Sequence, residues 1–125
     1  MKTNLFMKTI LIIDDEPDLC AFLKHMLTKE DFQVDCAHTL AEANVKLNMH
    51  PHPGVVLLDN NLPDGMGLDY MHSHPVEFAG SNVIMITADP APSIREKAAS
   101  EGISHFLQKP FSLSHVREMI DETPK

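Results

Sequence analysis

The sequence has no tryptophan, one tyrosine and only two cysteines in 125 residues. Cys20 and Cys36 lie far apart in the chain and form no C-x-x-C motif, so we expect reduced, mostly buried thiols. No apolar run approaches the ~18 residues that a membrane span requires. The first eight residues hold one short apolar group, which makes a poor signal peptide. These absences predict a cytoplasmic protein.

Positive charge is also scarce, with ten Lys and Arg residues against eighteen Asp and Glu residues and a net charge of -8. This balance disfavours direct binding of nucleic acid through its phosphates, and it leaves no polybasic patch for a membrane surface. Eight histidines are present, but the pairs His50/His52 and His72/His74 have no cysteine or acidic partners at zinc spacing. We therefore expect no dedicated zinc site.

What the sequence does contain is a series of short apolar runs rich in β-branched residues. The strongest are residues 10–13, 55–58 and 83–86, and residues 32–36 and 103–108 are weaker candidates. Uninterrupted apolar runs of this length are typical of strands buried on both faces. Segments with apolar residues at helical spacing separate them. Five alternations of strand and helix in a chain of this length predict one α/β domain with a parallel sheet.

Local signals place the starts of the helices. Thr39 and Glu42 form a capping-box pattern, in which Thr39 accepts a hydrogen bond from the helix start and Glu42 reaches back. Ser93 is expected to cap a helix that Gly102 closes, and Ser112 is expected to cap the last helix. Residues 32–36 alternate in polarity, which predicts a strand at the edge of the sheet.

Polar residues follow four of the apolar runs, at the points where the strands are expected to end. They are Asp14 and Asp15, then Asp59, Thr87 and Lys109. The carboxyl ends of parallel strands meet at one edge of a sheet, so these residues should converge. Clustered carboxylates repel one another unless a cation compensates, and Mg²⁺ prefers such oxygen ligands. A carboxylate in this setting could bind a metal, accept a proton or attack phosphorus.

Simpler roles exist for each residue taken alone. Asp14 and Asp15 could cap the following helix, since acids near a helix N-terminus are stabilising. Asp59 could form a turn, and Thr87 could be an ordinary residue at a strand end. The coincidence of four strand ends favours the functional interpretation.

Four motifs in order resemble those of receiver domains, the phosphoacceptor domains of two-component response regulators. They read Ile-Leu-Ile-Ile-Asp14-Asp15-Glu16, Leu-Leu-Asp59-x-Asn61-Leu-Pro63-Asp-Gly, Ile-Thr87-Ala88 and Lys109-Pro110-Phe111. The resemblance spans residues 9–123, which leaves residues 1–8 as an N-terminal extension and residues 124–125 as a tail or the start of a linker. It implies a flavodoxin-like (βα)₅ sandwich with a five-stranded parallel sheet.

The resemblance also implies a magnesium site beside a phosphorylated aspartate. Asp59 would accept the phosphoryl group. Asp15 would bind Mg²⁺ directly and Asp14 through water, with Asp59 and the backbone carbonyl of Asn61 as further ligands. Mn²⁺ could replace Mg²⁺ in this site.

Further residues would bind and sense the phosphoryl group. Thr87 and Lys109 would hold its oxygens, and Ala88 matches a small position that leaves the site accessible. Phe106 matches the aromatic switch position, which turns inward as Thr87 moves toward the phosphoryl group. Asn61 and Asp89 flank the path of the hydrolytic water, and we expect them to tune dephosphorylation.

The partners implied are a sensor histidine kinase or phosphotransfer protein as donor and a downstream effector protein or domain as receiver of the signal. A phosphorylation-dependent homodimer is also implied. The chain would be a signalling phosphoacceptor, with chemistry only at Asp59. It would be either a complete single-domain regulator or the receiver of a longer protein.

Two enzyme or cofactor-binding alternatives fit the sequence less well. A Mg²⁺-dependent phosphohydrolase of the haloacid dehalogenase type needs a second acid two residues after the nucleophile, and Asn61 occupies that position. An amide cannot act as a general acid or base. A dinucleotide-binding domain would need a G-x-G-x-x-G motif after the first strand, and the sequence has none there.

Overall fold

The computed structural model describes residues 8–88, 91–103 and 105–122. Within these ranges five strands form one parallel sheet in the order β2-β1-β3-β6-β7. Their bounds are β1 (Thr9–Ile13), β2 (Gln33–Ala37), β3 (Val55–Asp59), β6 (Asn82–Thr87) and β7 (His105–Gln108). The sheet confirms the predicted parallel topology, and β2 lies at an edge as its alternation indicated.

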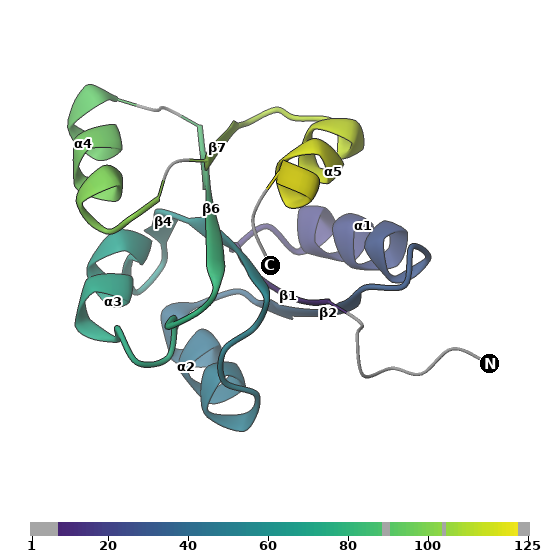
Figure 1. The fold of residues 1–125 in the computed structure, drawn as a ribbon, viewed down its shortest axis with the longest axis horizontal. Helices are drawn as coiled ribbons and strands as arrows, with labels where there is room; N and C mark the ends of the chain where they lie inside the picture. The colour runs from purple at the N-terminus through teal and green to yellow at the C-terminus, as the bar shows by residue number, and fades with distance from the viewer. Residues whose placement is uncertain (1–7, 89–90, 104, 123–125) are drawn as a thin grey trace.

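Helices cover both faces of this sheet (Figure 1). In the described ranges they are α1 (Pro17–Thr28), α2 (Leu40–Met49), α3 (Gly67–Ser73), α4 (Pro92–Ser100) and α5 (Leu113–Glu122). Helices α1 and α5 lie on one face, and α2, α3 and α4 lie on the other. None of these helices is long and apolar enough to cross a membrane.

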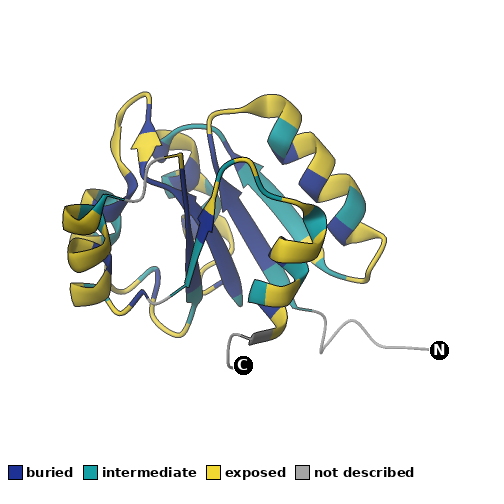
Figure 2. Ribbon diagram, turned by 90° about the horizontal axis from the view of Figure 1, so that it is seen from above, coloured by how far each residue is buried: buried dark blue, intermediate teal, exposed yellow. Residues whose placement is uncertain are grey.

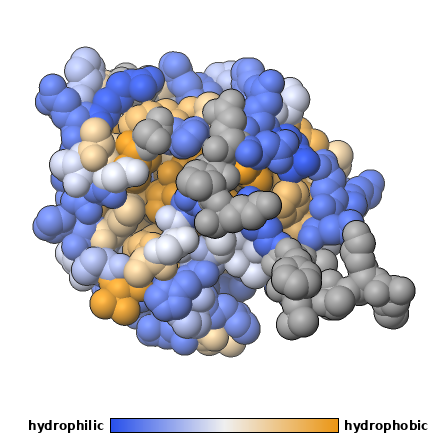
Figure 3. Space-filling model, in the orientation of Figure 1, coloured by the Kyte–Doolittle hydropathy of each residue, from blue (hydrophilic) through white to orange (hydrophobic). Residues whose placement is uncertain are grey.

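Alternate residues of the central strands supply the two hydrophobic layers. Ile10 and Ile12 of β1 pack with Leu23 and Leu27 of α1, whereas Leu11 faces the layer beneath α2 and α3. Figure 2 shows the buried central strands between helices whose outer sides are exposed. Figure 3 shows hydrophilic residues around the rim of one face and hydrophobic residues gathered toward its centre. A strand packed on both faces has little freedom to shift, so its end is a rigid support for a functional side chain.

The helix starts agree with the sequence in two of three cases. Thr39 Oγ1 accepts from Glu42 N at 3.0 Å, and Ser112 Oγ accepts from His115 N at 3.2 Å. The Glu42 carboxylate does reach back, but to the N–H of His38, one residue before the cap. The prediction for Ser93 was wrong, because α4 begins at Pro92 without a side-chain cap. Proline suits the first position of a helix, where its missing N–H is not needed.

A small hairpin follows β3, and its turn contacts the start of α2. Strands β4 (Asn61–Leu62) and β5 (Gly65–Met66) are antiparallel and joined by a two-residue loop. Asp64 in this loop accepts hydrogen bonds from Leu40 N at 2.8 Å and Ala41 N at 3.0 Å. These two N–H groups lower the pKa of the Asp64 carboxyl. The segment after β3 is therefore fastened to the N-terminus of α2.

We expect Thr39→Ala to lower the free energy of unfolding by about 1 kcal/mol, because Glu42 N loses its acceptor. Urea denaturation monitored by circular dichroism measures this change. Thr28→Ala is a matched control at the exposed last residue of α1 and should change stability by less than about 0.5 kcal/mol. An equal loss in both variants would contradict the capping role.

Candidate functional site

Three carboxylates meet at the carboxyl edge of the sheet. Asp14 and Asp15 follow β1, and Asp59 is the last residue of β3. One oxygen from each carboxylate lies within 4.8 Å of the others. Asp59 pairs in register with Ile86, so Thr87 stands one residue further along the neighbouring strand β6. The convergence expected from the strand ends is confirmed.

The three acids differ in exposure. Asp14 is fully buried, Asp59 is 5% exposed, and Asp15 faces solvent. Asp14 Oδ1 accepts a hydrogen bond from Glu16 N at 2.9 Å, and the buried Asp14 Oδ2 faces the ammonium of Lys109 at 3.0 Å. A buried carboxylate oxygen without a hydrogen bond is costly unless a cation faces it. Positive charge near these carboxylates would therefore stabilise the site.

The Lys109 ammonium supplies part of that charge. Its Nζ lies 3.0 Å from Asp14 Oδ2, 3.4 Å from Asp59 Oδ2 and 2.5 Å from Glu16 Oε1. Burial lowers the pKa of Lys109, but the bonds from Glu16 and Asp14 outweigh burial and raise the pKa above its usual value. Glu16 was not among the predicted site residues. The sequence could have indicated it, because Glu16 is the third consecutive acid after β1.

Without a bound cation, the site disfavours the ionised form of the Asp59 carboxyl. Burial raises the pKa of its carboxyl, and the negative charge of Asp14 raises it further. The hydrogen bond from Asn61 N to Asp59 Oδ1, at 3.0 Å, and the Lys109 ammonium act in the opposite direction without cancelling the rise. A cation bound here would favour the ionised carboxylate, which is the form that can act as a nucleophile.

The loop after Asp59 approaches the end of β3 very closely. A Cβ atom on Gly67 would lie 2.4 Å from the backbone oxygen of Asp59, so the loop requires glycine at this position. Asn60, which the sequence did not indicate, is 3% exposed. Its Oδ1 accepts from Leu68 N at 3.1 Å and its carbonyl accepts from Gly67 N at 2.9 Å. Asn60 thus ties the start of α3 to the strand end.

The remaining predicted residues surround the acids. Thr87 is 2% exposed and its carbonyl accepts from Lys109 N at 2.9 Å, while Ala88 is exposed beside it. Asn61 has an exposed side chain at the start of the hairpin. Asp89 lies outside the described residues. These positions agree with an accessible site whose floor is formed by strand ends.

Phe106 lies on β7 at the far side of Thr87. Phe106 pairs with Met85 and Gln108 pairs with Thr87, so the side chains of Phe106 and Thr87 share a face of the sheet. The Phe106 ring is partly buried, and the Arg95 guanidinium of α4 stands 4.7 Å from its centre. A cation–π contact therefore holds the ring in its present position.

Together these groups form a site that fits phosphorus chemistry. The three carboxylates suit a hard divalent cation, and Asp59 is rigidly placed to act as a nucleophile. The hydroxyl of Thr87 stands at the end of β6, and the ammonium of Lys109 comes from the residue that follows β7. Both groups suit the oxygens of a phosphoryl group.

The sequence profile of the response regulator receiver domain matches residues 10–121. Among curated proteins, the chain is 33% identical over 108 residues to the probable transcriptional regulatory protein TcrX of Mycobacterium tuberculosis. It is 34% identical over 110 residues to the response regulator protein PilR of Pseudomonas aeruginosa. The alignments cover 86% and 88% of this chain but 46% and 24% of the relatives, so the chain spans less than half of their length.

Solved structures confirm the predicted flavodoxin-like fold. The non-phosphorylated HemR receiver domain from Leptospira biflexa superposes with a TM-score of 0.81 at 26% identity, covering 94% of this chain and 97% of that chain. The chemotaxis protein CheY4 of Vibrio cholerae gives a TM-score of 0.85 at 20% identity, covering 94% and 99%. The second likeness concerns the fold alone.

The raised pKa of Asp59 has a measurable consequence for stability. The folded state binds the Asp59 proton more tightly than the unfolded chain, so stability falls as the pH rises above the unfolded value of about 3.9. Without divalent cations at pH 7, Asp59→Asn should therefore raise the free energy of unfolding. The gain should shrink as the pH falls toward that value, because Asp59 then becomes protonated in the folded protein.

Asp18→Asn is a matched control for this experiment, because Asp18 is an exposed acid in the first turn of α1. It should leave stability unchanged or lower it slightly, since acids stabilise a helix N-terminus. Urea denaturation between pH 3 and pH 7 compares the variants. A loss of stability in Asp59→Asn at pH 7 would show that its carboxylate is not destabilised by the site.

Proposed function

The chain belongs to the response regulator receiver domain family, and from this membership we propose that it is the phosphoacceptor of a two-component signalling pathway. Asp59 would take a phosphoryl group from a phosphohistidine of a sensor kinase or phosphotransfer protein. The observation that carries the proposal is the meeting of Asp59 with two further carboxylates and the Lys109 ammonium at one edge of the sheet.

The residues present fit a resident Mg²⁺ ion, which Mn²⁺ could replace. The buried Asp14 Oδ2 faces a single ammonium that Glu16 and Asp59 also share, and the three carboxylate oxygens lie close enough to share a cation. Asp14, Asp15, Asp59 and the backbone carbonyl of Asn61 would hold the ion. Bound Mg²⁺ would supply positive charge that offsets the carboxylates and the phosphoryl oxygens.

The chain's own residues would then carry out the transfer. An Asp59 carboxylate oxygen attacks the phosphorus, the phosphorus–nitrogen bond of the donor breaks, and its electron pair stays on the imidazole. The product is an acyl phosphate on Asp59. Lys109 neutralises charge on a phosphoryl oxygen, and the Thr87 hydroxyl donates a hydrogen bond to another. The exposed Ala88 leaves room for the donor.

The same residues would transmit the signal. When the Thr87 hydroxyl moves to the phosphoryl group, the Phe106 ring on the same face would turn inward and give up its contact with Arg95. This exchange would alter the surface that α4, β7 and α5 offer to an effector protein or domain. It could also favour a phosphorylation-dependent homodimer.

Loss of the phosphoryl group would return the domain to its unphosphorylated conformation. The backbone N–H of Asn61 bonds Asp59, and the exposed side chain of Asn61 could orient the hydrolytic water. Asp89 keeps this role as a prediction from the sequence. The chemistry stays within Asp59, so the domain would act as a signalling phosphoacceptor and not as an enzyme for outside substrates. We also propose that the receiver domain spans residues 9–123 and that the protein is cytoplasmic.

Incubation with Mg²⁺ and acetyl phosphate should add one phosphoryl group to the intact mass of the protein, in a base-labile form. Asp59→Asn should remain unlabelled because the nucleophile is gone. The exposed acid Asp18 offers the control, and Asp18→Asn should be labelled like the wild type. Labelling of Asp59→Asn to the wild-type level would rule out Asp59 as the acceptor.

The Arg95 contact allows a test of the switch. Replacing Arg95 with Met keeps an unbranched apolar stem but removes the cation–π attraction, worth about 0.5–1 kcal/mol at an exposed site. The inward population of Phe106 in the unphosphorylated protein should rise about twofold to fivefold. Phenylalanine ring resonances, assigned through Phe106→Leu, would report it.

Arg117→Met is the matched control, because the Arg117 guanidinium stands 5.1 Å from the ring of Phe32 on the opposite face of the sheet. It should leave the Phe106 resonances unchanged. If both variants shift the Phe106 resonances equally, or if neither does, the Arg95 contact does not specifically stabilise the position of the ring.

A further inference from the structure

Two cysteines meet where α1 packs against β2. Cys36 Sγ donates to the backbone oxygen of Cys20 at 3.6 Å, and Cys20 Sγ donates to the backbone oxygen of Asp14 at 3.4 Å. Both side chains lie in the hydrophobic layer between α1 and the sheet. Both cysteines are free. Two cysteines sixteen positions apart in sequence are thus brought together, with Cys36 Sγ against the backbone of Cys20.

The pair can be reached from the side of β2. Cys20 is buried, but Cys36 is partly exposed on the edge strand of the sheet. The backbone N–H of Cys36 donates a hydrogen bond to Oδ1 of the neighbouring Asp35 at 2.9 Å. A reagent arriving at this edge would meet Cys36 first.

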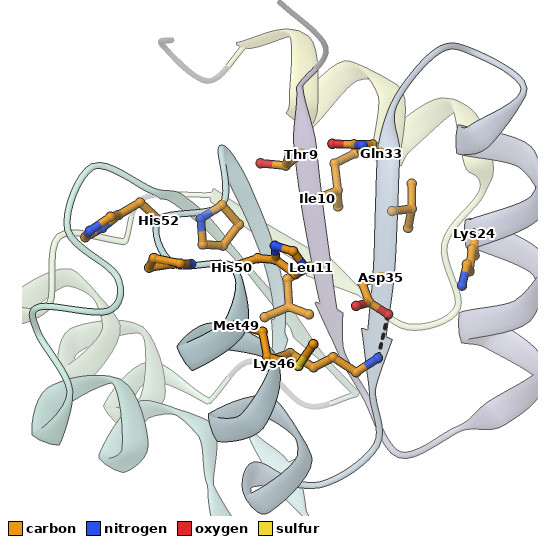
Figure 4. Close-up of a pocket in the computed structure, with 13 residues that line it drawn as sticks. Thr9, Ile10, Leu11, Lys24, Gln33, Asp35, Lys46, Met49, His50 and His52 are labelled. Atoms are coloured by element: carbon orange, nitrogen blue, oxygen red, sulfur yellow. Dashed lines mark hydrogen bonds and ion pairs between the residues drawn. The ribbon is translucent and has the colours of Figure 1, made fainter. Parts of the chain in front are cut away.

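A cavity of about 690 Å³ lies along β2 and is lined by Lys24, Lys46 and Asp35, the neighbour of Cys36 in sequence, but not by Cys36 itself. Figure 4 shows Lys24 on α1 and Lys46 on α2 approaching β2 from opposite sides, with Lys46 paired to Asp35 at 2.8 Å. Both ammonium groups act electrostatically on Cys36. The cavity volume suits a small molecule, and its two lysines favour one that carries carboxylates.

We propose that Cys20 and Cys36 are a modification site that closes to an intramolecular disulfide on reaction with a small, carboxylate-bearing disulfide such as oxidised glutathione. The Cys36 thiolate attacks one sulfur of the small disulfide, giving a mixed disulfide and releasing one small thiol. The Cys20 sulfur then attacks Cys36 Sγ and releases the second small thiol. The protein loses two electrons and two protons, and both pass to the two small thiols.

The order of attack follows from the surroundings of the two sulfurs. The Cys20 thiol beside it, helped by the charge of Lys24, lowers the pKa of Cys36 despite burial. Cys20 sits deeper, within the layer between α1 and the sheet, and is placed to resolve the mixed disulfide. Because Cys36 Sγ already lies 3.6 Å from the backbone oxygen of Cys20, the second step needs little movement of the backbone.

Closing the bridge has a consequence at the acid cluster. The Cys20 S–H donates to the carbonyl of Asp14, and a disulfide sulfur has no hydrogen to donate. Oxidation at the edge of the sheet would therefore remove one bond that fixes the backbone of Asp14. If Asp14 holds Mg²⁺, as the proposed function requires, oxidation should weaken the affinity for Mg²⁺ by about threefold.

The test uses the full chain, first reduced and then equilibrated in buffers of graded ratios of reduced to oxidised glutathione. Intact mass should show the loss of two hydrogen atoms, and maleimide labelling should fall from two thiols to none. Peptide mapping of the wild type should identify a Cys20–Cys36 crosslink that dithiothreitol reverses. This readout does not depend on the folding of any variant.

Two variants separate the steps. Cys20→Ser keeps a donor for the Asp14 carbonyl and should stop at a glutathione adduct on Cys36, whereas Cys36→Ser should stay unmodified. A wild-type protein that stays reduced at every ratio, keeps a stable adduct or links two chains would overturn the proposal.

Calorimetric titration with Mg²⁺ of the oxidised and reduced protein tests the link to Asp14. Equal affinities would refute that link while leaving the bridge intact. If the reduced protein bound no Mg²⁺, the proposed function would fail and the crosslink result would stand on its own. Oxidant-treated Cys36→Ser serves as the control and should bind Mg²⁺ like the reduced wild type.

Discussion

Repulsion among the carboxylates at the end of the sheet is the constraint on which the site depends. Apolar layers on both faces hold β1 and β3 in register, so Asp14 and Asp59 cannot move apart to relieve the repulsion. Lys109 reaches both acids and Glu16, and its ammonium offsets only part of the charge. The fold therefore maintains a cluster of acids that could hold a cation, at the expense of its own stability.

Three residues in the loop that follows β3 fix the geometry of this site. Asn60 bonds the start of α3, Gly67 lets the loop pass close to the Asp59 carbonyl, and Asp64 bonds the start of α2. None of these groups needs to touch a phosphoryl group. They restrict the backbone, so the Asp59 carboxylate and the backbone N–H of Asn61 keep a fixed geometry.

The parallel sheet and the meeting of its strand ends were predictable, because long apolar runs identify buried strands and parallel topology brings their ends together. Other features depend on contacts that periodicity does not encode. The hairpin strands are two residues each, too short for an alternating pattern. Ser93 lost its expected role because Pro92 already begins α4, and Glu16 joined the site through a lysine far away in sequence. The contact between Cys20 and Cys36 arises only when α1 folds onto β2.

The bonds between Asp64 and the amides of Leu40 and Ala41 extend the loop's influence to a helix outside the acid cluster. Any displacement of the hairpin changes the length of these bonds, and amide proton resonances are sensitive to hydrogen-bond length. A nitrogen–proton correlation spectrum would therefore register events at Asp59 through two signals from α2. Those signals provide an intrinsic spectroscopic reporter in a chain that has no tryptophan.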